Sequence, residues 1–106
     1  MPKITEFQKI VYAAARKIPK GKVSTYLEIA KAIRKPKSAR AVGNALNKNP
    51  FAPKVPCHRV VKSTGEVGGF ASGCKNKIAI LKKEGVQVKQ GKVVDFKKKK
   101  YLFKFL

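Results

Sequence analysis

Apolar residues recur at helical spacing in the first part of the chain. The first predicted helix spans residues 5–17 and begins at a capping box formed by Thr5 and Gln8. Pro19-Lys20-Gly21 ends this helix. One helical face carries its apolar side chains, which we expect to pack in a core: Phe7, Ile10, Val11, Ala14 and Ile18.

Two shorter helices follow, and together they predict a helix-turn-helix. The first begins at a second capping box, Thr25 with Glu28, and ends at Lys35-Pro36-Lys37. Ser38 is expected to cap the second. In that helix we expect Val42, Ala45 and Leu46 to face the core. Arg40, Asn44 and Lys48 are expected to face outward. Any antiparallel helix pair shows a similar pattern, so the spacing alone leaves that alternative open.

The second half of the chain predicts loops, one further helix and a hairpin. Residues 54–70 carry Pro, Gly and β-branched residues, which indicates loops with short strands. A fourth helix over residues 73–83 ends before Gly85 and is expected to bury Ile78, Ala79 and Leu81. The resulting fold class is mainly α with short β strands, a winged-helix-like helix-turn-helix.

The C-terminal end is rich in lysine. Residues 86–96, with Gln90-Gly91 at their centre, resemble a β-hairpin. The last ten residues mix lysines with apolar residues, and we expect them to pack on the core, to bind phosphates, or both. Residues 1–106 are therefore interpreted as one domain, of which residues 91–106 form a basic C-terminal extension.

Charge narrows the class of partner. The chain has 106 residues with 26 Lys and Arg against 5 Asp and Glu, a formal net charge of +21. Such a chain attracts polyanions, so nucleic acid or an acidic membrane surface is the expected partner, with a merely soluble basic protein as the alternative. The first apolar stretch is short and interrupted by charge, so we expect an intracellular protein without a signal or a membrane span.

Candidate chemistry is concentrated in Pro56-Cys57-His58-Arg59-Val60-Val61. A free cysteine is mostly an unreactive thiol at neutral pH, and a neighbouring base or cation converts it into the nucleophilic thiolate. A buried cysteine beside a surface His and Arg is the alternative. Cys74 is the other cysteine, and we expect both to be free thiols in a reducing interior.

Several separated motifs surround this hexapeptide in a specific order. They are Ser38-Ala39-Arg40-Ala41-Val42-Gly43-Asn44-Ala45, Asn49-Pro50, Gly65-Glu66-Val67-Gly68-Gly69-Phe70 and Lys83-Glu84-Gly85. Their order and spacing resemble the DNA-binding, active-site domain of the O6-alkylguanine-DNA alkyltransferases, over residues 7–88. The resemblance implies DNA repair by stoichiometric transfer of an alkyl group from O6 of guanine to the protein.

The resemblance implies a role for each catalytic residue. Cys57 matches the acceptor, whose sulfur takes the alkyl group by in-line displacement and keeps it as a stable thioether, so each molecule acts once. His58 matches the base that takes the thiol proton through a water, and Glu84 matches the carboxylate that orients this imidazole. Asn49 matches the residue that braces the active-site turn, and Tyr26 the hydroxyl that donates toward the guanine ring.

The resemblance also implies a pocket for the alkylated base. The backbone carbonyls of Cys57 and Val60 would accept hydrogen bonds from the guanine amino group. Lys77 matches a family lysine near the active-site loop, with a solvated helix face as the alternative. The apolar pocket wall would consist of Pro56, Leu46 and Phe70.

DNA contacts follow from the position of the target atom inside the stacked duplex. The base must be flipped out, and Arg40 matches the family residue that fills the gap in the stack, with its helix in the minor groove. Tyr26, Lys35 and Ser63 match family contacts to DNA, mostly to the backbone. Binding should therefore tolerate sequence context and weaken steeply with salt.

The chain departs from the family pattern in two places. Ala71 stands where some members have a serine that helps to hold O6, so a backbone N–H would have to do this, and the substrate range is affected. The family also usually carries an additional N-terminal domain, whereas here the active-site domain begins almost at once. We expect a monomer acting on double-stranded DNA that contains O6-alkylguanine.

Two alternatives from other classes remain open. The first is a damage sensor resembling the alkyltransferase-like proteins, which bind alkylated guanine but lack the acceptor cysteine, so that Cys57 is the discriminating residue. The second is a plain basic helix-turn-helix module in which Cys57 and His58 are incidental. We expect no cofactor and no metal, because Cys57, His58 and Cys74 lack the usual zinc-ligand spacing.

Overall fold

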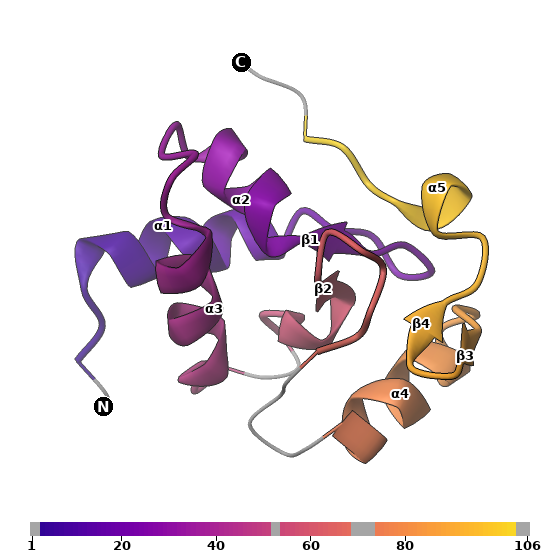
Figure 1. The fold of residues 1–106 in the computed structure, drawn as a ribbon. Coiled ribbons are helices and arrows are strands. Elements are labelled where there is room, and N and C mark those ends of the chain that lie inside the picture. Colours follow the sequence, from indigo (N-terminus) through magenta and orange to yellow (C-terminus); the bar gives the residue numbers. More distant parts are fainter. Residues whose placement is uncertain (1–2, 52–53, 69–73, 104–106) are drawn as a thin grey trace.

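The computed structural model describes residues 3–51, 54–68 and 74–103. In Figure 1 the N-terminal helices lie on one side and the C-terminal elements on the other, with the segment that carries Cys57 between them. The elements in chain order are α1 (Glu6–Ala15), β1 (Ser24–Thr25), α2 (Tyr26–Ala32), α3 (Ala39–Asn47), the 3-10 helix η1 (Cys57–Arg59), β2 (Val60–Val61), α4 (Cys74–Lys83), β3 (Val88–Lys89), β4 (Lys92–Val93) and α5 (Phe96–Lys99).

Helix α1 begins as its sequence predicts. The Thr5 side chain accepts a hydrogen bond from the Gln8 N–H, and the Gln8 side chain accepts one from the Thr5 N–H, which confirms the capping box. Its buried face packs with α2 and α3 in a first apolar core. The expectation for Ile10 is wrong, because its side chain is 44% exposed. Tyr12, which was not among the expected core residues, is buried instead. Its hydroxyl donates a hydrogen bond to the Ala45 carbonyl at 2.7 Å.

Helices α2 and α3 form the predicted helix-turn-helix. Thr25 caps α2 by accepting from the Glu28 N–H at 2.9 Å. Ser38 stands at the N-cap position of α3 but does not cap it. Its hydroxyl instead donates to the Lys35 carbonyl at 2.6 Å, which closes the preceding turn. The inward and outward faces of α3 are as predicted.

A short parallel pairing joins the helical half to the Cys57 segment. Strand β1 pairs with β2 in parallel, with Ser24 opposite Val60 and Thr25 opposite Val61. All four residues are buried. The pairing places the strand that follows η1 beside the strand that precedes α2, although residues 26–56 separate β1 from η1 along the chain.

Helix α4 covers a second apolar core, formed by the residue before β1, by β2 and the turn after it, and by the C-terminal part: Val23, Val61, Val67, Leu81, Val86 and Val93. Leu81 is buried as expected and Ile78 is half-buried, but the expectation for Ala79 is wrong because it is exposed. Lys77 is completely buried in its place. Gly85 ends the helix with φ +91°, a conformation that favours glycine.

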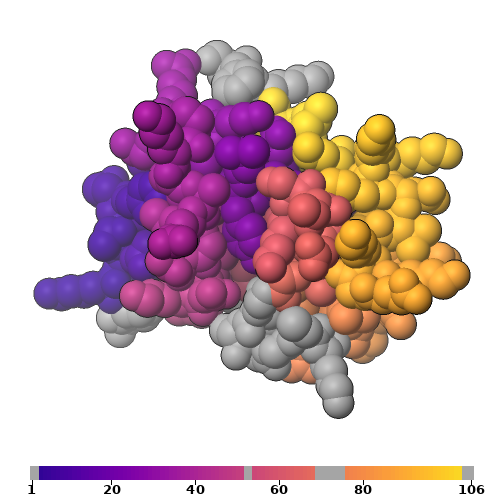
Figure 2. Space-filling model, viewed as in Figure 1, coloured from indigo at the N-terminus to yellow at the C-terminus, as the bar shows by residue number. Residues whose placement is uncertain are grey.

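The C-terminal part contains the predicted hairpin and one helix that the sequence pattern did not predict. Strands β3 and β4 pair antiparallel around Gln90 and Gly91, whose φ values of 52° and 78° suit a two-residue turn. Helix α5 follows, and the chain then runs beside Val23. Figure 2 shows this segment, in yellow, next to the salmon surface of the turn after β2. No helix in the described part of the chain is long and apolar enough to cross a membrane.

Candidate active site

Cys57 is the first residue of η1 and carries a free thiol. Its exposed fraction is 6%, and it packs in the first core with Val55 and Val60. The tight turn forms because the Cys57 N–H donates to the Val55 carbonyl at 2.9 Å and the Arg59 N–H donates to the Pro56 carbonyl at 2.9 Å. The thiol is therefore held by a rigid turn in an apolar environment that excludes most water.

His58 is buried and contacts the carboxylate that the family resemblance implies, Glu84. Its Nε2 lies 3.1 Å from Glu84 Oε2, at the residue that follows α4. A carboxylate accepts hydrogen bonds, so the proton is on Nε2 and Nδ1 is the nitrogen left to act as a base. Glu84 thus fixes both the orientation and the tautomer of the imidazole.

The Arg59 guanidinium has a different role from the one its position beside Cys57 indicates. Its Nε and Nη2 donate to the two oxygens of Glu84 at 2.9 and 2.6 Å, and its Nη1 donates to the Ile18 carbonyl at 2.8 Å. Arg59 therefore joins η1 to the end of α4 and to the segment after α1. Sequence analysis singled out Arg59 as part of the hexapeptide but could not identify Glu84 and Ile18 as its partners, because both are distant along the chain.

The ionisation of the site follows from this arrangement. Burial lowers the pKa of the His58 imidazole below its ordinary value, although the hydrogen bond and charge of Glu84 act in the opposite direction. Burial acts to raise the pKa of the Glu84 carboxyl, but hydrogen bonds from Arg59 and His58 outweigh it, so this pKa lies below its ordinary value. At neutral pH the site holds a neutral imidazole beside an ionised carboxylate.

Asn49 braces the segment that leads into the Cys57 turn. Its Nδ2 donates to the Val55 carbonyl at 2.7 Å, and its Oδ1 accepts from the Phe51 N–H at 2.9 Å. These are the side-chain to backbone hydrogen bonds expected of an Asn at a turn. Because Val55 is two residues before Cys57, Asn49 helps to set where the thiol lies.

Lys77 lies beneath the other side of the turn. It is completely buried, which excludes the alternative of a solvated helix face. Its Nζ donates to the Val60 carbonyl at 2.6 Å and lies 3.5 Å from the Tyr26 hydroxyl oxygen. Lys77 therefore connects α4, β2 and the first residue of α2.

Comparison with known proteins identifies the family. The model of the family described as 6-O-methylguanine DNA methyltransferase, DNA binding domain, matches residues 6–86. The chain belongs to this family. A methylated-DNA–protein-cysteine methyltransferase of Methanosarcina acetivorans is 54% identical over 84 residues, which are 79% of this chain and 54% of that protein. One from Mycobacterium leprae is 44% identical over 79% of this chain and 51% of that protein.

Solved structures of two kinds resemble the chain. Mycobacterium tuberculosis OGT in complex with DNA has a TM-score of 0.75 and 44% identity, over 77% of this chain and 51% of that one. S. pombe Atl1 in complex with damaged DNA containing O6-carboxymethylguanine has a TM-score of 0.83 and 34% identity, over 94% of this chain and 98% of that one. The chain thus spans about half the length of the curated relatives it matches, and nearly all of Atl1.

The family's DNA-binding fold explains where the remaining predicted residues lie. Arg40 is exposed in the first turn of α3, the second helix of the helix-turn-helix. Lys35 is exposed in the turn before it, and Ser63 is exposed in the turn after β2. Tyr26 is half-buried, and its ring lies 3.8 Å from where a Cβ on Gly43 would stand, which is ordinary van der Waals contact with α3.

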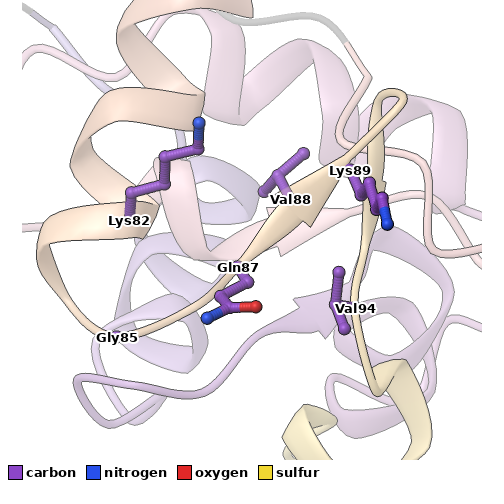
Figure 3. Close-up of a pocket in the computed structure, with 6 residues that line it drawn as sticks. All are labelled: Lys82, Gly85, Gln87, Val88, Lys89 and Val94. Atoms are coloured by element: carbon purple, nitrogen blue, oxygen red, sulfur yellow. The ribbon is translucent and has the colours of Figure 1, made fainter.

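The pocket residues divide into those that the structure describes and those that it does not. Pro56, Leu46 and Val60 are buried, and Leu46 and Val60 belong to the same apolar core as Cys57. Phe70 and Ala71 lie outside the described residues. An open pocket of about 570 Å³ between α4 and the hairpin is a different feature, because no predicted site residue lines it (Figure 3). The candidate site is therefore the Cys57 turn and not this pocket.

Proposed function

We propose that the chain repairs DNA by transferring an alkyl group from O6 of guanine to Cys57, once per molecule. The observation that carries this proposal is the buried arrangement of Cys57, neutral His58 and ionised Glu84 on the DNA-binding fold of this family. The names of the curated relatives support alkyl transfer to a protein cysteine. The net charge of +21 supports a polyanionic substrate.

The chemistry proceeds as a balanced displacement. His58 Nδ1 accepts the Cys57 thiol proton through a water, which leaves a thiolate next to the alkyl carbon. The sulfur forms a bond to that carbon while the bond from carbon to O6 breaks, and the electron pair returns to guanine. The proton that His58 took from the thiol then returns through water to the guanine ring, which restores the normal base and the neutral imidazole. The Tyr26 hydroxyl donates toward the ring as its negative charge develops, and Lys77, which approaches the Tyr26 oxygen, strengthens that donor.

The protein binds the duplex and flips the target base out of the stack. Unstacking and unpairing a base costs a few kcal/mol, which phosphate contacts and an inserted side chain offset. Arg40 takes the place of the flipped nucleotide, since it is exposed at the start of α3. Lys35, in the turn before α3, and Ser63, in the turn after β2, contact the DNA backbone.

A damage sensor is the second candidate. It is favoured by the similarity to Atl1, which extends over nearly the whole of both chains. In that function the pocket would hold the alkylated base without bond cleavage, and a partner protein would complete repair. The presence of Cys57 with its base argues against this candidate, because a sensor has no need of an activated thiol.

Intact mass separates the two candidates. The protein is incubated with a duplex that contains one O6-methylguanine, and its mass is measured before and after. Transfer predicts the gain of one methyl group, located on Cys57 by peptide fragmentation and absent in Cys57→Ala. Cys74→Ala is the matched control and should gain the methyl group like wild type. Binding of the duplex without any change of mass would contradict transfer and leave the sensor.

A further inference from the structure

The lysines after residue 86 lie outside the region that defines the family. The family model ends at residue 86, and residues 87–106 contain seven lysines against one acid, Asp95. The described part of this segment forms the hairpin of β3 and β4, then α5, then a single bridge at Lys100 and a run without regular structure to residue 103. The role of this segment therefore does not follow from the family.

The segment after α5 is held to the core by its backbone. The Val23 N–H donates to the Lys99 carbonyl at 2.9 Å, and the Tyr101 N–H donates to the Val23 carbonyl at 2.6 Å. Lys22 Nζ donates to the Lys98 carbonyl at 3.0 Å. Lysines on this segment are thus carried by a fixed backbone, so that binding a ligand orders little additional chain.

The hairpin and α5 dock on the turn that carries Ser63. The Val67 N–H donates to the Gly91 carbonyl and the Val93 N–H donates to the Gly65 carbonyl, each at 2.9 Å. Gly65 has φ +91°, and a Cβ there would meet the Phe96 ring at 3.3 Å, so the absence of a side chain lets α5 approach. In Figure 2 the yellow and salmon surfaces are accordingly continuous.

Three lysines on this docked segment are exposed, one in β4 and two in α5, and we refer to them together as the lysine shelf: Lys92, Lys97 and Lys98. Within the described residues none of the three has an ion pair. Lys100, by contrast, is used internally, with its Nζ 3.5 Å from the Glu28 carboxylate. The shelf therefore presents positive charge to solvent.

We propose that the lysine shelf binds phosphates of the duplex beside the lesion and so extends the DNA surface outward from Ser63. The inference rests on the proposed function only in taking DNA as the partner. It follows from the docking of the segment on the Ser63 turn and from the lack of ion pairs at these three lysines within the described residues. Contacts to phosphates carry no sequence information, so the shelf would strengthen binding to any duplex, damaged or not.

The test compares two triple variants with the same loss of charge. The shelf variant is Lys92→Gln, Lys97→Gln and Lys98→Gln. The matched control is Lys3→Gln, Lys17→Gln and Lys20→Gln, exposed lysines before and after α1 for which no ion pair is seen in the described residues. Affinity for an undamaged duplex is measured by fluorescence anisotropy over a series of salt concentrations, after circular dichroism has shown that both variants fold.

The shelf variant should lose affinity about tenfold at low salt, and its slope of log affinity against log salt should be shallower by about 2 to 3, since each lost phosphate contact contributes about 0.9. The control should keep the wild-type slope. Equal losses in both variants, or no loss in the shelf variant, would overturn the proposal. The proposal would also be overturned if the shelf variant lost binding to anionic lipid vesicles but kept the wild-type affinity for DNA. Undamaged DNA needs no alkyl transfer, so this result is independent of whether Cys57 is methylated.

Discussion

His58 Nε2 lies 3.1 Å from Glu84 Oε2, and the same carboxylate accepts two hydrogen bonds from Arg59. One acid therefore serves two purposes: it holds the imidazole in the tautomer that can accept a proton, and it fixes the turn that carries the thiol. The chain has only 5 acidic residues against 26 Lys and Arg, and Glu84 is one of them.

Replacement of the acid should affect chemistry and not DNA binding. In Glu84→Gln the imidazole loses its ionic partner and its tautomer is no longer fixed, so we expect alkyl transfer to slow by about 10² or more. Glu28→Gln is a matched control, because Glu28 is a similarly buried acid that pairs with Lys31 and Lys100. Single-turnover transfer and duplex affinity are measured for both. Equal slowing in the two variants would contradict the role of Glu84.

Arg59 should contribute to stability through its geometry. A lysine at this position cannot hydrogen-bond both oxygens of Glu84 and the Ile18 carbonyl together, so Arg59→Lys should lower the free energy of unfolding by about 1–3 kcal/mol. Urea unfolding at neutral pH measures the change. Arg40→Lys, at an exposed position, should change stability little. A loss as small as that of a surface ion pair, below about 0.5 kcal/mol, would show that the contacts are not held in solution.

The pH dependence should follow His58. Because the folded-state pKa lies below the ordinary value of about 6.5, the folded protein binds fewer protons than the unfolded chain. Stability is therefore fully present above about pH 6.5 and falls as the pH drops from there through the folded pKa. The contribution of Glu84, whose pKa is also lowered, is lost only at more acid pH, below the ordinary carboxyl value.

Two titrations check this assignment. Urea unfolding between about pH 5 and pH 8 should show a slope in wild type that is absent in His58→Gln. The rate of transfer to free O6-alkylguanine should stay constant down to below about pH 6.5 and then decline, because the neutral base persists. A decline that begins above that value would contradict the neutral, buried imidazole.

Arg40 should matter only when a base must leave the duplex. Arg40→Ala removes the side chain that fills the stack, so we expect slower transfer from a duplex and a smaller change with a free alkylated base. Both rates are measured with the same preparation. Equal effects on the two substrates would rule out a role in filling the stack.

The elements that sequence predicted well are those with local signals. The capping box at Thr5 and Gln8, the faces of α3 and the Gln90-Gly91 hairpin depend on residues close together along the chain. Cys57, His58 and Glu84 could be named together because they resemble family motifs, not because their spacing showed a contact. Their hydrogen-bond geometry came only from the structure.

What sequence missed are contacts between distant segments. Arg59 meets Ile18 across 41 positions, and no local pattern marks such a pair. The helical pattern left open a solvated position for Lys77, but the side chain is buried, because the Val60 carbonyl and the Tyr26 hydroxyl accept its ammonium inside the core. Helix α5 was missed because four consecutive lysines show no apolar period, and its position depends on Phe96 packing against Gly65.

The central claim is that Cys57 accepts one alkyl group and then stops. Its most direct test is a titration in which a duplex with O6-methylguanine is supplied in excess over the protein and repaired guanine is counted at the end point. The account predicts a plateau at one repaired base per protein molecule, with one methyl group on Cys57 and none transferred by Cys57→Ala. Repair beyond one equivalent, or no repair while the duplex is bound, would contradict it.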